Sequence, residues 1–194
     1  VLGLRIDRID EFATRTRLLG RAIGEPARAA GVVDSVTATL ARVRAATTAA
    51  IAAGAPRPRV LWPLVGTPLY VIGGGSFLSE LVTIAGGANV FGDDARPSPE
   101  VSREAILARD ADLVLVGPEG ARRIAADPAW RGLRAVRAGR VLVYDTTLVL
   151  RPSVQLGSSA EAIARLLHPG VLDARGAARP PAVPPVAAPA TGTE

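Results

Sequence analysis

Few side chains in this sequence could carry out catalysis or hold a metal ion. The chain has no cysteine and a single histidine, His168, so thiolate chemistry is excluded and a conventional zinc site lacks ligands. His168 stands beside Pro169 at the end of an expected helix, where a positive charge offsets the partial negative charge of the helix dipole. We therefore predict a surface position for His168. The acidic pair Asp93–Asp94 fits a solvated loop better than a hard-cation site. We therefore expect no metal site and no resident cofactor.

The run Gly73–Gly75 followed by Ser76 looks at first like a phosphate-binding loop. The dinucleotide fingerprint would require glycine at position 78, where the chain has Leu78, and a P-loop requires lysine, which the chain lacks. The glycines are better explained by a tight turn that lets backbone approach a ligand or a neighbouring segment. A serine nucleophile at Ser76 or Ser102 would need a base, and nothing in the spacing brings His168 to either. We expect no catalytic residue.

The composition limits the classes of partner. The 194 residues carry a formal net charge of +5, and all 23 basic residues are arginine. The densest basic set is Arg131, Arg134, Arg137 and Arg140, but the other arginines are scattered. Aromatic residues make up only 4%, so base-stacking platforms are lacking, and we expect no nucleic-acid partner.

The stretch from Thr67 to Val116 gives the clearest secondary structure. Ser76 is a good N-cap for a helix whose apolar residues recur at helical spacing until Gly86–Gly87. Ser102 similarly caps a second helix. Val101 and Ile106 are spaced to form a hydrophobic staple, an apolar contact across the start of that helix. The apolar run from 112 to 116 is typical of a strand buried on both faces.

The flanking segments extend this pattern to a mostly parallel sheet covered by helices on both faces, an α/β lobe of three layers. Further strands are expected at 59–65 and 140–145, with Pro63 marking an irregularity, an edge or an early end. Helices are expected at 119–126, before Arg140 and at 155–167. Trp62 and Trp130 are assigned to packing.

The chain before the lobe is predicted to be helical. After a possible strand at 1–5, one helix is expected from about Ile9 to Gly24. A second, from Pro26 to about Ala53 with Gly31 as a weak point, would be roughly 40 Å long. On its pattern alone it could be a spacer between two lobes or an ordinary packed helix. After Pro169 the sequence becomes rich in proline and alanine, which indicates a disordered tail or linker.

Several segments resemble the C-terminal lobe of periplasmic binding proteins that serve ABC importers of cobalamin, haem and ferric siderophores. They are PLYVIGGGSFLSELVTIAGGANVF, PEVSREAILARDADLVLV, DPAWRGLRAVRAGRVLVYD and LVLRPSVQLGSSAEAIARLLHP. The resemblance implies two lobes joined by a long helix. Residues 1–24 would end an N-terminal lobe that is largely missing, 25–56 would form the interlobe helix and linker, 57–169 the C-terminal α/β lobe, and 170–194 the tail. We interpret the sequence, which lacks an initiator methionine and a signal peptide, as a fragment or processed product.

The resemblance also implies a ligand site at Tyr70, Ser98 and Arg151. Tyr70 aligns with a cleft aromatic of the cobalamin-binding relatives, and Arg151 matches an arginine near the cleft. Two positions depart from the family pattern: Ser98 stands where tryptophan is frequent, and Thr147 stands where an acid is expected. The ligand therefore stays open among a corrinoid, haem and a ferric chelate. Tyr70 could also be a surface loop aromatic, and Arg151 simply an exposed side chain.

Glu104 is the acid that the resemblance assigns to permease docking, through arginines of the transporter. It also falls in the first turn of a helix, whose dipole favours a carboxylate, so it could serve only that helix. The resemblance implies a monomeric, non-enzymatic protein that is periplasmic or extracytoplasmic, with or without a lipid anchor. It would capture a metal chelate and deliver it to the permease of an ABC importer. The alternatives are an α/β enzyme domain acting on a nucleotide or cofactor, and a non-catalytic interaction lobe.

Overall fold

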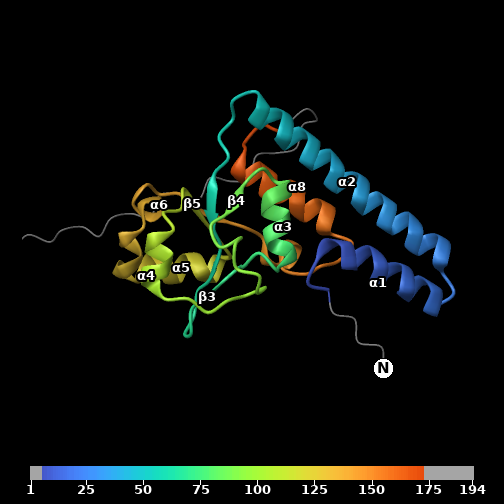
Figure 1. Cartoon of the computed structure of the whole chain (residues 1–194), viewed down its shortest axis with the longest axis horizontal. Coiled ribbons are helices and arrows are strands. Elements are labelled where there is room, and N and C mark those ends of the chain that lie inside the picture. The colour runs from blue at the N-terminus through green and yellow to red at the C-terminus, as the bar shows by residue number, and fades with distance from the viewer. Residues whose placement is uncertain (1–5, 173–194) are drawn as a thin grey trace, which may run out of the picture.

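A parallel sheet of four short strands forms the centre of the molecule, in the order β4–β1–β5–β6 (Figure 1). The computed structural model describes residues 6–172. The strands are β4 Ala88–Asn89, β1 Arg59–Leu61, β5 Leu113–Val116 and β6 Val141–Val143. All three pairings are parallel, as expected where helices connect successive strands of one sheet.

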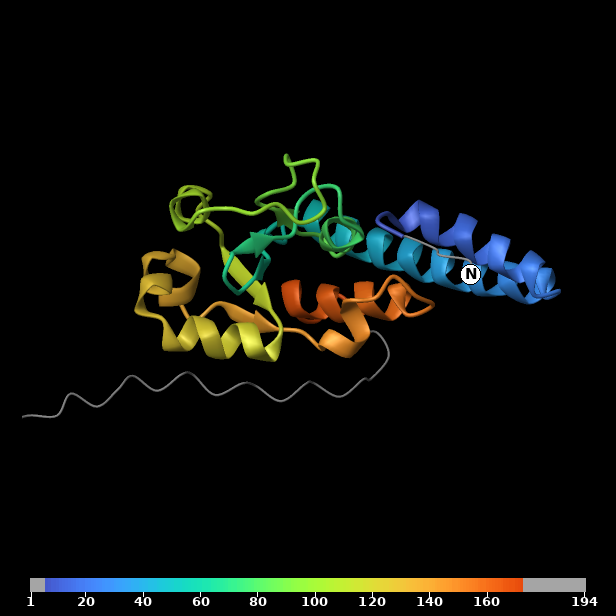
Figure 2. The ribbon, with the colours of Figure 1, turned by 90° about the horizontal axis from the view of Figure 1, so that it is seen from below.

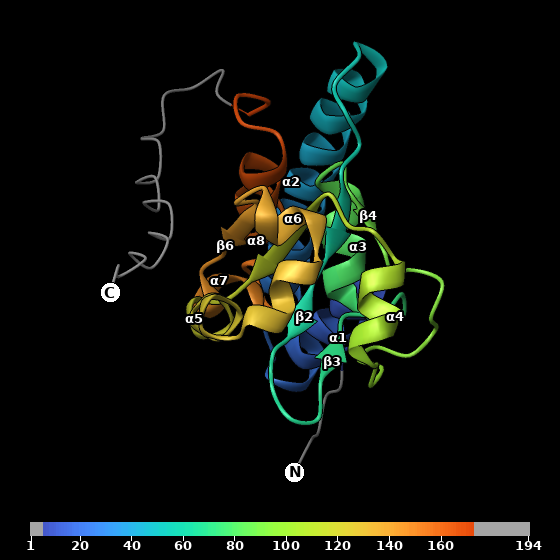
Figure 3. The same ribbon diagram turned by 90° about the vertical axis from the view of Figure 1, so that its left-hand side faces the viewer.

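Helices cover both faces of the sheet. Leu113 and Leu115 of β5 belong to the apolar cluster on one face, and Val114 and Val116 belong to the cluster on the other, because side chains alternate along a strand. The helices on the first face are α2 (Pro26–Ala52), α3 (Phe77–Ile84) and α8 (Leu156–Leu167). Those on the second are α4 (Arg103–Ala108), α5 (Pro118–Ala126), the 3-10 helix η1 (Pro128–Gly132) and α6 (Arg134–Arg137). Figure 3 shows the second set in front of the strands and α2 and α8 behind them, so the predicted three-layer α/β fold is confirmed.

The predicted helix caps are present. The Ser76 hydroxyl accepts a hydrogen bond from the backbone N of Leu78 at 3.2 Å, and that of Ser102 accepts one from Ala105 at 3.2 Å. Gly86, just after α3, has φ +83°, a left-handed conformation that glycine adopts without steric cost. Trp62 and Trp130 are buried in the core, as expected.

Two helices precede the sheet, α1 (Ile9–Ala22) and α2 (Pro26–Ala52), and pack side by side as a hairpin (Figures 1 and 2). The second helix is unbroken at Gly31, and its buried residues from Val33 to Val43 lie against the core that α3 and α8 share. In Figure 1 the hairpin extends away from the sheet. The assignment of α2 as an interlobe helix, with the lobe boundaries that accompany it, stays a prediction.

The strand predicted at 59–65 is present at its start, and the early end that Pro63 suggested is confirmed. The strand β1 ends at Leu61, and Pro63–Leu64 form a separate strand, β2, that pairs antiparallel with β3, Tyr70–Val71. The chain changes partner here because proline has no N–H for the parallel ladder. The sequence analysis also missed β3, β4 and α7 (Thr146–Val149), which are too short to show periodicity.

His168 does not lie on the surface as predicted. Its side chain is buried, and Nε2 lies 3.3 Å from the carbonyl oxygen of Gly86. The ring fits there because Gly86 has no Cβ, which would stand 2.6 Å from Nε2. The histidine thus closes the carboxyl end of α3 rather than facing solvent. The predicted strand at 1–5 and the tail beyond 172 lie outside the described residues.

Candidate functional site

Two of the three predicted ligand residues lie on adjoining segments. Tyr70, half-buried, begins β3 and forms a bridge with Glu100. The backbone N of Val71 donates to the carbonyl of Pro99 at 3.0 Å, and that of Gly73 donates to Pro97 at 3.0 Å. Ser98, which is exposed, lies between these two carbonyls in sequence. The pairing of the 70–73 and 97–100 segments therefore brings Tyr70 and Ser98 into one wall.

The glycine run holds that wall together by direct backbone contact. A Cβ added at Gly73, Gly74 or Gly75 would lie 2.1–2.2 Å from a carbonyl oxygen of the 92–96 loop. The backbone N of Gly74 also donates to the carbonyl of Asp94 at 2.7 Å. The expected close backbone approach is thus confirmed, and the partner is a neighbouring segment of the same chain.

Charged and amide side chains fix the loop further. Asn89 donates to the carbonyl of Ile72 at 2.9 Å and to the Ser79 hydroxyl at 3.0 Å. Asp94 accepts from its neighbour Arg96, and this hydrogen bond lowers the pKa of Asp94 to about 2. Asp93 pairs with Arg109 at 2.8 Å. These pairings explain the two aspartates as structural parts of the loop.

Arg151 lies apart, in the segment that follows α7. Its side chain is exposed, and within residues 6–172 it makes no hydrogen bond or ion pair, so none joins it to Tyr70 or Ser98. Leu150 and Val154 nearby are 38% and 61% exposed. Sequence reasoning missed both, because nothing in LVLRPSV shows which of its apolar residues face outward.

The segment before Arg151 is fixed to the core by two aromatic rings. Trp62, after β1, and Tyr144, after β6, lie with ring centroids 4.9 Å apart, and the indole N–H donates to the Tyr144 hydroxyl at 3.3 Å. Burial raises the pKa of Tyr144. Asp145 then caps α7: its carboxylate accepts from the hydroxyl and backbone N of Thr147, which lowers the pKa of Asp145. An acidic residue, Asp145, therefore lies two residues before position 147, where the family pattern expects one.

Glu104 is exposed in the first turn of α4. A hydrogen bond from the Ser102 hydroxyl is the main cause that lowers the pKa of Glu104 below its ordinary value. The adjacent Arg103 turns elsewhere: it pairs with Asp127 at 2.5 Å and lies over the ring of Trp130, 5.8 Å from its centroid. No ion pair joins Glu104 to another residue of the described chain.

Two well-formed hollows among residues 6–172 are lined by residues other than Tyr70, Ser98 and Arg151. One, of about 810 Å³, lies between α1, α2 and α3. The other, of about 450 Å³, lies between the β2–β3 turn and the helices α4, α5 and η1. Tyr70, Ser98 and Arg151 therefore line neither of these two hollows.

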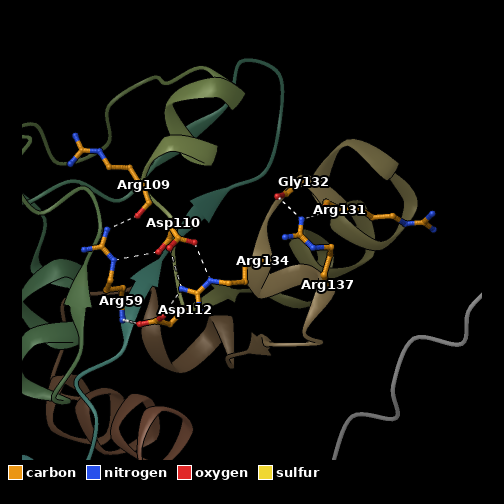
Figure 4. A network of polar contacts seen from close by, with 8 residues as sticks. All are labelled: Arg59, Arg109, Asp110, Asp112, Arg131, Gly132, Arg134 and Arg137. Atoms are coloured by element: carbon orange, nitrogen blue, oxygen red, sulfur yellow. Dashed lines mark hydrogen bonds and ion pairs between the residues drawn. The ribbon is translucent and has the colours of Figure 1, made fainter.

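Two members of the dense arginine set, Arg134 and Arg137, make contacts within the protein, and Arg134 does so at the amino-terminal edge of the sheet (Figure 4). Arg134 pairs with Asp110 at 3.1 Å and with Asp112 at 2.8 Å, and Asp112 also accepts from the backbone N of Arg59. Arg137 donates to the carbonyls of Arg131 and Gly132. These contacts give Arg134 and Arg137 a structural role, and the absence of a nucleic-acid partner stays a prediction.

Residues 6–172 contain no group of three or more histidine, cysteine, aspartate or glutamate side chains placed to hold a metal ion. Within the same range, every helix falls short of the length and apolar character needed to cross a bilayer.

Comparison with known proteins gives the family. Residues 1–148 match the family model described as periplasmic binding protein. The chain belongs to this family. Among sequence relatives of this periplasmic binding protein, the vitamin B12-binding protein of Salmonella typhimurium is 35% identical over 81 residues, which are 42% of this chain and 30% of the relative. The cobalamin-binding protein of Halobacterium salinarum is 27% identical over 169 residues, covering 82% of this chain and 44% of the relative. The chain thus spans less than half the length of these curated relatives.

Solved structures of periplasmic binding proteins share the fold. A possible iron-binding protein from Staphylococcus epidermidis superposes with a TM-score of 0.74 at 17% identity, covering 87% of this chain and 66% of that one. The haem-binding protein of Roseiflexus sp. RS-1 gives 0.71 at 21% identity, covering 84% and 64%. The vitamin B12-binding protein of Vibrio cholerae gives 0.67 at 21% identity, covering 84% and 63%. At these identities the likeness establishes the α/β architecture of the periplasmic binding protein.

Proposed function

We propose that this chain is part of the substrate-binding component of an ABC importer, which captures a metal chelate and delivers it to a permease. The observation that carries the proposal is the wall built from Tyr70 and Ser98, held by backbone contacts to Gly73–Gly75. A wall fixed in this way suits binding without chemistry, because it presents side chains to a ligand and holds no nucleophile and base together.

The side chains available describe the ligand. Tyr70 offers an aromatic ring, and Leu150 and Val154 offer exposed apolar surface on either side of the Arg151 cation. Such a set fits a large chelate with an apolar face and acidic or strongly polar groups at its rim. A corrinoid, haem and a ferric siderophore all fit this description. The metal arrives with the cargo, so the protein needs no metal ligands or cofactor of its own.

The relatives named above are binding proteins, three of them for vitamin B12 or cobalamin, one for haem and one described as a possible iron-binding protein. The proposal extends that activity to this chain and assigns it to the extracytoplasmic side of the membrane, as a monomer that binds and releases and does not catalyse. An open wall on one lobe buries little of a large ligand, so the whole protein should bind much more tightly than residues 1–194 alone.

A titration of the full-length protein tests the ligand. Cyanocobalamin, haemin and a ferric hydroxamate are added separately and followed by their own absorbance. One of the three should bind with a Kd in the micromolar range or below, and residues 1–194 should bind it at least tenfold more weakly, about 1.4 kcal/mol. Absence of binding by all three, or turnover of a nucleotide, would contradict the proposal.

The second part of the proposal is that Glu104 docks on the permease. Its carboxylate is exposed, ionised and fixed to the first turn of α4, which suits bidentate pairing with an arginine of the partner. The alternative is that Glu104 only stabilises its own helix. Glu104→Arg separates the two: docking predicts lost transporter association with unchanged ligand affinity, whereas a helix role predicts a small loss of stability alone. Asp34→Arg on α2, whose side chain is 76% exposed, serves as the control for charge reversal.

A further inference from the structure

The larger hollow, of about 810 Å³, runs along α3 from its first turn to its carboxyl end. We call it the α3 hollow. Its other walls are α1, α2, Arg57 and the edge strand β4, so segments distant in sequence meet there (Figure 1). Its volume lies within the range of roughly 300–1,000 Å³ that small-molecule sites occupy. It shares no lining residue with the set proposed to bind the chelate.

The floor of the α3 hollow is aliphatic. Ile9 of α1, Leu40 and Ala41 of α2, Ile84 of α3 and Ala88 of β4 line it, and among the described residues no aromatic side chain does so. A flat chelate would find no ring to stack on here. The floor suits an aliphatic chain, which gains free energy from burial alone and needs no directional partner.

The charges beside the first turn of α3 are used within the protein. Arg8 pairs with Glu80 at 2.5 Å and donates to the carbonyl of Gly74 at 3.1 Å. The carboxylate of Asp10 accepts from the backbone N of Glu11 at 2.9 Å. A ligand that opened the Arg8–Glu80 pair would leave one of the two charges without its partner, so this end offers little to an ion.

Two arginines line the hollow at the carboxyl end of α3. Nε of Arg57 donates to the carbonyl of Gly87 at 3.3 Å, which fixes the guanidinium there. The Thr47 hydroxyl donates to the carbonyls of both Arg44 and Ile84, at 3.1 and 2.8 Å, and so ties the α2 turn that bears Arg44 to the same end of α3. Both arginines are exposed, and within residues 6–172 neither guanidinium has a carboxylate partner.

The carbonyls that end α3 do not compete for these guanidinium groups. Those of residues 81–83 accept from the backbone N–H groups of residues 85–87, and that of Ile84 accepts from the Thr47 hydroxyl. The remaining N–H donors of Arg44 and Arg57 are therefore available to a ligand. Guanidinium groups bind carboxylate and phosphate through paired, charge-assisted hydrogen bonds, so this end of the hollow favours an anion.

We propose that the α3 hollow binds a small amphipathic anion. Its carboxylate or phosphate head pairs with Arg44 and Arg57, and its aliphatic chain lies on the floor formed by Leu40, Ile84 and Ala88. The ligand is a free molecule rather than a lipid head group at a bilayer surface, because the hollow receives the head and the chain together. This site is additional to the proposed chelate site and does not depend on it.

Decanoate below its micelle concentration is the probe, and decanol is its uncharged match. Calorimetric titration of the full-length protein should give one decanoate site with a Kd in the micromolar range, and decanol should bind at least tenfold more weakly. Arg44→Gln and Arg57→Gln should each weaken decanoate binding about tenfold or more, the loss expected for a hydrogen bond between charged groups. Arg28→Gln is the matched control, because Arg28 is exposed on α2 and lies outside the hollow; it should bind as wild type does.

A second pair of variants tests the floor. Ala41 and Ala38 are both exposed on α2, and only Ala41 lines the hollow. Ala41→Phe should therefore weaken decanoate binding about tenfold or more, because its ring takes the place of the chain, while Ala38→Phe should not. Chelate affinity should stay at the wild-type value in all of these variants, since none of them touches Tyr70, Ser98 or Arg151.

Several results would overturn the site. They are no decanoate binding by the full-length protein, equal binding of decanoate and decanol, and wild-type affinity in both Arg44→Gln and Arg57→Gln. Flotation with phosphatidylglycerol vesicles separates the two sources of an anionic head: binding to vesicles without binding of decanoate would overturn the free ligand. If Arg57→Gln unfolds, since Arg57 contacts Gly87, Arg44→Gln on the exposed side of α2 decides the question.

Discussion

The carboxylate of Glu80 on α3 accepts a hydrogen bond from the backbone N of Ile9 at 2.7 Å, and its other oxygen pairs with Arg8 at 2.5 Å. Glu80 thus satisfies an otherwise unpaired N–H at the start of α1, an interaction that the dipole of α1 strengthens. Nearby, the backbone N of Phe77 donates to the carbonyl of Asp7 at 2.6 Å. Together these bonds attach the start of α1 to α3.

Glu80→Ala should loosen this attachment. A partly buried charged hydrogen bond contributes about 1.5–3 kcal/mol, so we expect a loss of that order in the free energy of unfolding. Hydrogen exchange should rise in the first turn of α1 before it rises in the sheet. Glu119→Ala is the control, because its side chain is 60% exposed and pairs only within α5; it should change stability by at most about 0.5 kcal/mol. Equal protection of α1 in wild type and Glu80→Ala would contradict the assignment.

Gly74→Ala should displace the loop that carries Ser98. The added Cβ would stand 2.2 Å from the carbonyl oxygen of Gly92, and backbone cannot give way as a flexible side chain can. We expect a loss of about 1–3 kcal/mol and weaker chelate binding by the full-length protein. Gly31→Ala in α2, where a Cβ meets no atom within 4 Å, should instead stabilise by about 0.5–1 kcal/mol. Denaturant unfolding and ligand titration measure both variants, and unchanged affinity in Gly74→Ala would separate the loop from the ligand site.

His168→Ala should open the carboxyl end of α3. The change removes a buried ring and leaves the Gly86 carbonyl without its partner, which we expect to cost about 1–3 kcal/mol. Thr47→Val tests the same helix end independently, because the Thr47 hydroxyl donates to the carbonyl of Ile84 at 2.8 Å; about 1 kcal/mol should be lost. Thr37→Val, exposed on the same α2, is the control and should leave Tm within a degree or two. A His168→Ala protein as stable as wild type would contradict the role of His168 in closing the carboxyl end of α3.

Long periodic segments and capped helices were predictable from the sequence, because their signals are local. The helices α1, α2 and α3 repeat apolar residues at helical spacing, and Ser76 and Ser102 start their helices as a hydroxyl at an N-cap should. The strand β5 was recognisable because both of its faces are buried. The two-residue strands β2, β3 and β4 were not, since their pairing depends on contacts made after the chain has folded.

The candidate site was less predictable for the same reason. The resemblance singled out Tyr70 and Ser98, but only the backbone pairing of the 70–73 and 97–100 segments explains why they adjoin. Exposure of Leu150 and Val154 and burial of His168 are properties of packing, which the residue types do not encode. Asp145 was overlooked because it lies two residues from the expected position.

Association with the permease should depend on pH through Glu104. The Ser102 hydroxyl stabilises the ionised carboxylate and holds its pKa below the ordinary 4.5, so the charge that pairs with arginine is present above that pKa and is lost as pH falls through it. Binding of the full-length protein to the permease should therefore persist down to a pH below 4.5 and then fall. Ser102→Ala removes the hydrogen bond, so the midpoint should move upward toward 4.5, while the lost N-cap lowers stability by about 1 kcal/mol. Ser98→Ala should leave the midpoint unchanged.

Surface plasmon resonance across pH 3.5–7 measures the shift. It is limited to conditions where far-UV circular dichroism shows the folded protein. A midpoint that is the same in wild type, Ser102→Ala and Glu104→Gln would remove Glu104 from the interface.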